Sequence, residues 1–205
     1  MKWVVYCFTM AVKCLLLLLF SIFYRLRRKG AEQVPKDGGV ILVANHISFF
    51  DPPLLQLLCG RLVTYTPRST LDDNFFYRWI TKVCAVVPLR RGQADLAAIK
   101  QVTGLLKQGS MIAMFPEQTR SKDGTMAPLK AGFHMLARRA KVPVVPIFIE
   151  GAYDIWPRQR KYPRLFGRLR ITAGPPLEVA DMSREDAVQA LQGAFVTLGA
   201  EIRTA

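Results

Sequence analysis

The sequence predicts an α/β fold in which helices flank a mainly parallel, mixed sheet, preceded by a hydrophobic helix that anchors the chain to a membrane. Short continuous apolar runs, such as residues 40–44 and 111–115, are typical of strands buried on both faces. These runs alternate with helical stretches, which indicates parallel strands joined by crossover helices. Residues 3–24 are instead almost wholly apolar. We therefore expect an anchor with a basic flank at residues 1–30 and one globular domain at residues 31–205.

The elements of the domain follow from the apolar runs and from the turn residues between them. Strands are expected at 40–44, 62–66, 85–89, 111–115, 142–149 and 169–172. Helices are expected at 52–58, 72–81, 93–108, 130–140 and 183–202, and the basic stretch 157–170 is expected to be a loop. At the start of the first of these helices, Asp51 is expected at the N-cap and Pro52 at the first helical position.

Local features support the later elements. The apolar residues of 93–108 recur on one helical face. Two prolines within 142–149 favour an edge or sheet-end strand, because proline cannot donate to a strand ladder. Ser183 and Asp186 resemble a capping box at the start of the last helix.

The N-terminal apolar run is long enough to span the roughly 30 Å hydrocarbon layer of a membrane. Lys13 interrupts it, so the helix could instead lie obliquely with this lysine reaching the headgroups. A basic cluster follows at residues 25–29, which places this end and the domain on the cytoplasmic face (of the inner membrane, in a bacterium). A cleaved signal peptide is disfavoured, because the basic cluster lies on the wrong side and no small-residue cleavage site follows.

The net charge of +14 implies an anionic partner, such as nucleic acid, an anionic membrane or a phosphorylated substrate. The chain shows no RNA-binding aromatic signature, which favours lipid and argues against nucleic acid. The four cysteines form no C-x-x-C pair and have no histidine at metal-ligand spacing, so we expect neither a disulfide framework nor a metal site.

His46 and Asp51 form the first candidate catalytic constellation. His46 closely follows an expected buried strand, and ligands of open α/β sheets bind at the carboxyl ends of strands. A tight loop would bring the Asp51 carboxylate to one ring nitrogen, so that the other can take a proton from an attacking alcohol. The substrate hydroxyl would then be the nucleophile. The alternative from these residues alone is that Asp51 only caps a helix.

Two further constellations could bind an anion. Glu117, Thr119, Arg120 and Ser121 follow the expected strand 111–115, where Arg120 and the two hydroxyls suit phosphate oxygens. Arg90 and Arg91 precede a helix and could form a phosphate clamp. Solvated polar turns are the alternative for both. The chain contains no nucleophile elbow, P-loop or dinucleotide-binding glycine motif, which disfavours serine hydrolases, nucleotide kinases and dinucleotide enzymes.

Taken together and in order, these segments resemble the glycerolipid acyltransferase family, best known for 1-acylglycerol-3-phosphate acyltransferases. The family's blocks are N-H-x-x-x-x-D, a block ending in arginine, F-P-E-G-T-R-S, and an apolar V-P-I-x-P strand. Here they correspond to residues 45–51, 86–91, 115–121 and 142–146.

The resemblance implies that residues 31–205 form an acyltransferase domain, with His46 as general base and Asp51 as its orienting carboxylate. Residues at the other blocks would bind the lysophospholipid acceptor: Asn45, Arg91, Glu117, Thr119, Arg120 and Ser121. The acyl donor would be a thioester of coenzyme A or acyl carrier protein, with no other cofactor and no metal.

The chain departs from the family pattern at two positions. Gln118 stands where the family has glycine, which permits backbone conformations that glutamine resists. Arg90 precedes Arg91 where the family usually has aspartate. The leading expectation is acylation of 1-acylglycerol-3-phosphate to phosphatidate. The alternatives are another lysophospholipid or a lyso-aminolipid, such as lyso-ornithine lipid, as acceptor, and a non-catalytic lipid-binding membrane protein.

Overall fold

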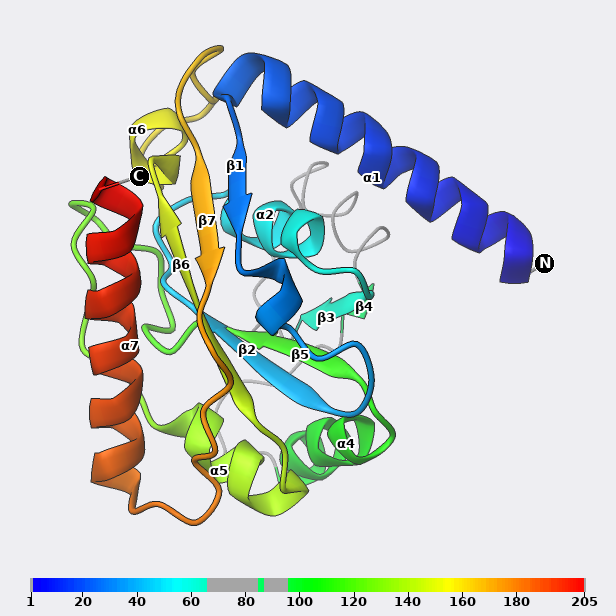
Figure 1. Cartoon of the computed structure of the whole chain (residues 1–205), viewed down its shortest axis with the longest axis vertical. Coiled ribbons are helices and arrows are strands. Elements are labelled where there is room, and N and C mark those ends of the chain that lie inside the picture. The colour runs from blue at the N-terminus through cyan, green and yellow to red at the C-terminus, as the bar shows by residue number, and fades with distance from the viewer. Residues whose placement is uncertain (1, 66–84, 87–95, 205) are drawn as a thin grey trace.

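The computed structural model describes residues 2–65, 85–86 and 96–204. The helix expected at 72–81 and the arginines at 90 and 91 lie outside these residues. The strands are β1 (Arg27–Lys29), β2 (Val40–Ala44), β3 (Val63–Tyr65), β4 (Ala85–Val86), β5 (Met111–Met114), β6 (Val144–Glu150) and β7 (Arg170–Ala173). The helices are α1 (Lys2–Tyr24), α2 (Asp51–Leu58), α4 (Leu96–Lys107), α5 (Gly132–Ala140), α6 (Ala152–Ile155) and α7 (Arg184–Thr204), with a short 3₁₀ helix at Ala31–Gln33 (Figure 1).

The strands form one seven-stranded sheet in the order β1-β7-β6-β2-β5-β3-β4. All neighbouring pairs are parallel except β6 and β7. The edge pair β1–β7 therefore runs opposite to the other five strands. This arrangement confirms the predicted α/β class with a mixed, mainly parallel sheet.

The central strand β2 shows why its apolar run is continuous. Every residue of β2 is fully buried. Val40 and Leu42 pack into one core cluster, whereas Ile41 and Val43 pack into the cluster on the other face of the sheet. In Figure 1, α2 lies over the first face and α4, α5 and α7 lie over the second. The expectation of a strand covered on both sides is therefore confirmed.

The expectation that 142–149 forms an edge or sheet-end strand is wrong, because β6 lies between β7 and β2. Pro146 accepts a hydrogen bond from the Gly174 amide at 2.9 Å, so its missing N–H faces the β7 side of the strand. The ladder with β7 begins only at Ile147. Proline is tolerated inside the sheet because it stands just before the pairing that would have needed a donor.

The basic segment that we expected only as a flank of the anchor contributes strand β1. Arg27, Arg28 and Lys29 pair in parallel register with β7, and their side chains are exposed. Three consecutive charged residues show no apolar alternation, so their pairing is invisible in the sequence.

Helix α1 projects beyond the domain at its N-terminus and packs onto it near its end (Figure 1). Phe20 and Tyr24 are buried against α2 and its surroundings. Of the helices in the part of the chain that the structure describes, none combines the length and the apolar character that a membrane crossing requires.

Two glycines provide a matched test of the junction between the 3₁₀ helix at Ala31–Gln33 and the sheet. Gly30 and Gly38 both have φ near 74°, but a Cβ on Gly30 would lie 2.0 Å from the Ala173 carbonyl oxygen, whereas one on Gly38 would meet nothing. Gly38→Ala should therefore cost only the left-handed strain of about 1 kcal/mol. Gly30→Ala should cost roughly 1–3 kcal/mol more, because the backbone must move. Denaturant unfolding measures both, and equal losses would contradict the close approach of β1 and β7.

Candidate active site

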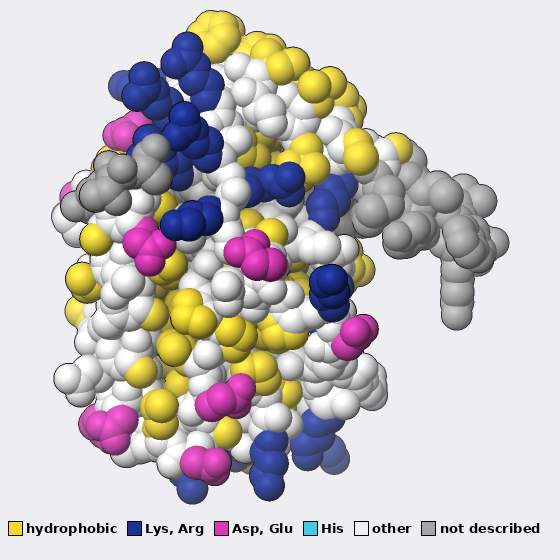
Figure 2. All heavy atoms as spheres, viewed as in Figure 1, with side chains coloured by type: hydrophobic (Ala, Val, Ile, Leu, Met, Phe, Trp, Pro, Cys, Tyr) yellow, Lys and Arg dark blue, Asp and Glu magenta, His cyan; other side chains and the backbone are white. Residues whose placement is uncertain are grey.

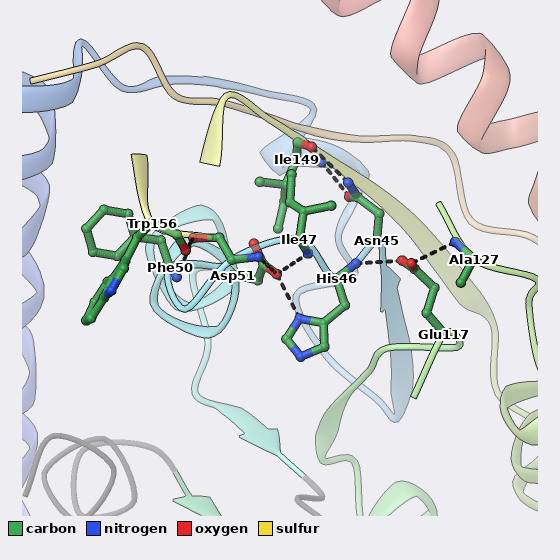
Figure 3. Close-up of polar contacts among 10 residues, drawn as sticks. Asn45, His46, Ile47, Phe50, Asp51, Glu117, Ala127, Ile149 and Trp156 are labelled. Carbon is green, nitrogen blue, oxygen red and sulfur yellow. Dashed lines mark hydrogen bonds and ion pairs between the residues drawn. The ribbon is translucent and has the colours of Figure 1, made fainter. Parts of the chain in front are cut away.

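Two loops meet at the carboxyl edge of the sheet because the strands they follow are neighbours. Val43 of β2 pairs with Met114 of β5. The chain therefore leaves both strands at the same level, and this brings His46 beside Phe115 and Glu117. Figure 3 shows the Glu117 side chain reaching from its own loop to the backbone of His46. Loops at the carboxyl ends of adjacent parallel strands are where ligands of open α/β sheets bind.

The imidazole of His46 and the carboxylate of Asp51 are in direct contact. His46 Nδ1 lies 2.7 Å from Asp51 Oδ2. The side chain of Asp51 is completely buried, and that of His46 is 18% exposed. This pair therefore has one partner shielded from water and one that reaches the surface.

Contrary to our expectation, Asp51 is not the N-cap residue of α2. The helix begins at Asp51 itself, and Phe50 occupies the N-cap position without a side-chain cap bond. The carboxylate turns back into the preceding loop, where Oδ2 accepts the amide N–H groups of Ile47 at 2.7 Å and Ser48 at 2.8 Å. These local hydrogen bonds satisfy the carboxylate and also close the loop that carries His46, which a cap bond to the helix N-terminus would not do.

The hydrogen bonds around Asp51 assign the tautomer of His46. Oδ2 already accepts two amide N–H groups, so Nδ1 is assigned as the third donor. The lone pair is then on Nε2, which points away from Asp51 (Figure 3). The ring stacks on Phe115 with a centroid separation of 4.0 Å, which fixes its plane. The arrangement suits a general base whose imidazolium form is stabilised by a buried carboxylate.

Glu117 holds the backbone of His46. Its Oε1 accepts the His46 amide at 2.7 Å, and its Oε2 accepts the Ala127 amide at 3.0 Å. Burial raises the pKa of the Glu117 carboxyl, and the two backbone N–H bonds oppose this shift by stabilising the ionised form. Since Glu117 is only 6% exposed and both of its carboxylate oxygens accept hydrogen bonds, we interpret it as a positioning residue. The acceptor-binding role implied by the resemblance stays a prediction.

Asn45 and Ser121 also act on the loop backbone. The Asn45 amide forms a reciprocal pair with the backbone of Ile149, at 2.9 and 2.8 Å. The Ser121 amide donates to the His46 carbonyl at 2.8 Å, while its hydroxyl accepts from the Gly124 amide in the following turn. Both side chains are buried. The structure thus accounts for these two residues by positioning, and substrate contact by either stays a prediction.

Arg120 and Thr119 are more open to solvent. Thr119 is exposed, and the Arg120 guanidinium lies over the Phe49 ring at 3.5 Å from its centroid. Stacking on an aromatic face leaves the edge of a guanidinium able to donate to an anion. Phosphate binding by these residues stays a prediction, and Arg91 lies outside the described residues.

Gln118, at the position where the family has glycine, adopts a backbone conformation that glycine favours. Its φ is 65°, in the left-handed region. The Gln118 amide donates to the Phe115 carbonyl at 3.0 Å, which closes a tight turn after β5. The side chain is exposed and can accommodate this turn at a strain of about 1 kcal/mol. The substitution therefore leaves the fold of the loop in place.

Sequence reasoning missed Ser48 and Trp156. The Ser48 hydroxyl donates to the Trp156 carbonyl at 2.8 Å and accepts from the Phe50 amide at 3.1 Å. A serine hydroxyl can accept a hydrogen bond from the backbone amide two residues later and so mark a turn, and this local signal could have been used for Ser48. Nothing in the sequence indicates that the carbonyl of Trp156, more than 100 positions away, is its partner.

The fold and the site define an α/β protein with a carboxylate-oriented histidine at the sheet edge, a class suited to general-base catalysis on a bound alcohol. The acyltransferase family model matches residues 25–150, which contain the whole constellation. The chain belongs to this acyltransferase family.

The similar proteins found for this chain are named as 1-acyl-sn-glycerol-3-phosphate or 1-acyl-sn-glycerophosphate acyltransferases. The chain is 32% identical to the chloroplastic 1-acyl-sn-glycerol-3-phosphate acyltransferase BAT2 of Brassica napus, over 76% of this chain and 46% of the relative. It is 28% identical to the 1-acyl-sn-glycerol-3-phosphate acyltransferase of Bacillus subtilis, over 74% of this chain and 73% of that one. The crystal structure of the 1-acyl-sn-glycerophosphate (LPA) acyltransferase PlsC from Thermotoga maritima superposes with a TM-score of 0.75, at 26% identity, covering 88% of this chain and 73% of that chain. The chain spans about half the length of the plant relatives it matches.

The positioning role of Glu117 predicts which kinetic constant changes. In Glu117→Gln, the side-chain NH₂ group would face one of the two backbone N–H groups that the carboxylate oxygens now accept. That N–H would be left without an acceptor, at a cost of about 1–3 kcal/mol. We expect kcat to fall by roughly 10- to 100-fold, with little change in the KM for the acceptor. Glu185→Gln, an exposed change on α7, is the control. A rise confined to the acceptor KM would contradict positioning and favour direct acceptor binding.

Proposed function

We propose that the protein transfers a fatty acyl group from an acyl thioester to the free hydroxyl of 1-acylglycerol-3-phosphate, forming phosphatidate. The observation that carries this proposal is the His46–Asp51 pair, with its outward Nε2, on the same site as Arg120. Family membership and the printed names of the relatives support the choice of reaction and acceptor.

In the proposed reaction, His46 Nε2 takes the proton from the acceptor hydroxyl as its oxygen attacks the thioester carbonyl. The C–O bond forms, the tetrahedral intermediate collapses with cleavage of the C–S bond, and the departing thiolate takes the proton from the imidazolium. Asp51 stabilises the imidazolium throughout, because three donors hold its buried Oδ2 in place. A positioned base of this kind contributes roughly 10²- to 10⁴-fold to a rate.

The acceptor phosphate is assigned to the cationic side of the site. Arg120 is held against Phe49, next to the loop of His46, and a guanidinium binds phosphate oxygens through paired N–H donors. Arg91 would add a second charge. The donor would be coenzyme A or acyl carrier protein as thioester, and the chemistry described needs no further cofactor.

The two histidines of the chain provide a matched test of the mechanism. His46→Ala should lower phosphatidate formation from labelled acyl thioester and lysophosphatidate by roughly 10²-fold or more, because the base is lost. His134→Gln should keep the activity, since His134 is buried on α5, where its Nε2 contacts the Met182 carbonyl, outside the site. Wild-type turnover by His46→Ala would disprove the mechanism.

An acceptor panel tests the proposed substrate in the same assay. Lysophosphatidate should be acylated faster than lysophospholipids with larger headgroups and than lyso-ornithine lipid. Equal or faster transfer to an acceptor without phosphate would exclude lysophosphatidate as the preferred acceptor. The departure from the family pattern at Gln118 motivates this comparison. Lipid binding without transfer from any thioester would instead identify a non-catalytic protein.

We further propose that α1 holds the domain on the cytoplasmic face of the membrane by lying in the interface. Its exposed apolar residues recur at helical spacing, namely Leu15, Leu18, Leu19 and Ile22. The opposite side packs on the domain through Phe20 and Tyr24. Such a two-sided helix buries one apolar face in lipid and keeps the other on protein.

Lys13 fits this orientation of α1. Its ammonium group donates to the Cys59 carbonyl at the end of α2, so the charge faces the domain. Partial burial lowers the pKa of Lys13. The cation that interrupts the apolar run therefore has a protein partner and does not need to enter lipid.

Exposed leucines of α1 should control membrane partitioning. In Leu18→Ser/Ile22→Ser, the loss of two inserted side chains, each worth about 1.5–3 kcal/mol when fully buried, should weaken vesicle binding by 10-fold or more. Val196→Ser is the control, because Val196 is similarly exposed but lies on α7. Cosedimentation with lipid vesicles measures the effect. Equal binding by both variants would remove α1 from the membrane contact.

A further inference from the structure

Four arginines from separate segments line one hollow beside the end of α1. Arg25 follows the helix, Arg27 lies on β1, and Arg168 and Arg170 belong to the end of the 157–170 segment. The hollow measures about 210 Å³. Arg170 pairs with Glu150 at 3.6 Å, and Asp154 lines an adjoining hollow, so two carboxylates offset part of this charge. Positive charge remains in excess. None of these residues has a role in the proposed transfer reaction.

The preceding loop exposes large apolar side chains next to these arginines. Tyr162, Leu165 and Phe166 have exposed fractions of 68%, 63% and 66%. The segment 157–170 also contains six Arg or Lys residues and no Asp or Glu. An exposed apolar tip in a cationic setting is atypical of an inert surface loop and indicates a partner that is both apolar and anionic.

The loop is held firmly against the end of α1. Gly167 and Leu169 donate their amides to the carbonyls of Phe23 and Tyr24, at 3.2 and 2.9 Å. The Tyr24 hydroxyl donates to the Arg164 carbonyl at 3.1 Å. A Cβ on Gly167 would lie 2.5 Å from the Ile155 side chain, so the chain passes too closely for a larger residue. The exposed tip is therefore presented by a fixed backbone.

The apolar tip continues the exposed apolar face of α1. The ring of Phe166 lies 5.9 Å from that of Phe23 in the last turn of the helix. Figure 2 shows hydrophobic side chains along the upper edge of the molecule, and Lys and Arg side chains gathered directly below this edge on the side of β1 and β7. The apolar edge and the basic patch thus lie side by side on one end of the protein.

We propose that the loop tip of Tyr162, Leu165 and Phe166, with the arginine hollow beneath it, is a second membrane contact that selects anionic phospholipids. The apolar side chains enter the interface beside α1, and the guanidinium groups bind headgroup phosphates by charge-assisted hydrogen bonds. The proposal rests on the membrane location proposed for α1. It adds a lipid preference that α1 cannot supply, because the exposed residues at positions 15, 18, 19 and 22 of that helix are uncharged.

The occupant is a bilayer surface and not an acidic carrier protein, because the apolar tip and the apolar face of α1 form one continuous edge. A bilayer contacts both parts at once. An acidic protein docked on the arginines would leave the apolar tip and the exposed leucines without a partner.

The test compares full-length variants on vesicles of phosphatidylcholine with and without one third phosphatidylglycerol (a composition of about 33%, chosen to give a negative surface potential). Wild type should bind the anionic vesicles more tightly. Arg25→Gln/Arg168→Gln should weaken that binding by roughly 10- to 30-fold, since each charge near an anionic surface contributes on the order of a 5-fold gain. Binding to the neutral vesicles should change little. Arg138→Gln/Arg139→Gln removes the same charge from the exposed side of α5 and should change neither.

A second variant tests the apolar tip. Leu165→Ser/Phe166→Ser should weaken binding to both kinds of vesicle, because insertion does not depend on lipid charge. Circular dichroism and thermal melting show whether each variant is folded. The proposal is overturned if wild type shows no preference for anionic vesicles, or if the Arg25/Arg168 variant binds them as tightly as the Arg138/Arg139 variant does. If the Arg25/Arg168 variant binds vesicles as wild type does but loses transfer from acyl carrier protein, the proposal is also overturned, in favour of a protein partner.

The outcome is independent of the proposed enzymatic reaction. Vesicle binding is measured without substrate, so it remains informative if wild type fails to form phosphatidate. Conversely, turnover of wild type in neutral detergent micelles tests the reaction without an anionic surface.

Discussion

The buried carboxylate of Asp51 is the group on which the geometry of the site depends. One of its oxygens, Oδ2, accepts hydrogen bonds from the imidazole of His46 and from the amides of Ile47 and Ser48. The other oxygen, Oδ1, has no hydrogen-bond partner within the described residues. A fully buried carboxylate is costly unless such donors surround it, so the loop conformation and the charge of Asp51 stabilise each other. The same bonds direct Nε2 of His46 outward.

The loop is fixed from both ends by residues that are distant in sequence. Glu117 and Ser121 hold the amide and the carbonyl of His46, and Ser48 is tied to Trp156. Phe50, which precedes Asp51, contacts the rings of Phe20 and Tyr24 in α1 at centroid distances of 4.9 and 5.2 Å. The helix proposed to lie on the membrane is therefore one residue away from the carboxylate that orients the base. Docking of α1 and alignment of His46 share the same aromatic cluster.

The sequence predicted the parts of this site that depend on local order. His46 and Asp51 lie within one seven-residue block after a strand with an unmistakable apolar run, and their contact follows from a tight loop. The role of Glu117 could not be predicted in the same way, because it requires the adjacency of β2 and β5 and the occupation of both carboxylate oxygens. Strand β1 escaped prediction because its three residues are charged and its pairing is made by backbone alone. The prolines of the segment 142–149 misled, because the direction in which the missing N–H of Pro146 points depends on register.

The loop of His46 and the arginine hollow stand at the same edge of the sheet, which follows from the antiparallel pairing of β6 and β7. Asn45, beside His46, is bonded to Ile149 near the end of β6. Because β7 runs antiparallel to β6, the beginning of β7 lies at this same edge, with Arg170 opposite Glu150 and Arg27 opposite Arg170. Had β7 been parallel, its first residues would lie at the far edge, and the basic surface would be separated from the site by the length of the sheet. The reversal thus puts the proposed membrane contact and the proposed base on one side of the domain. In the proposed reaction, a lipid acceptor held in the membrane plane would then approach His46 without leaving that side of the domain.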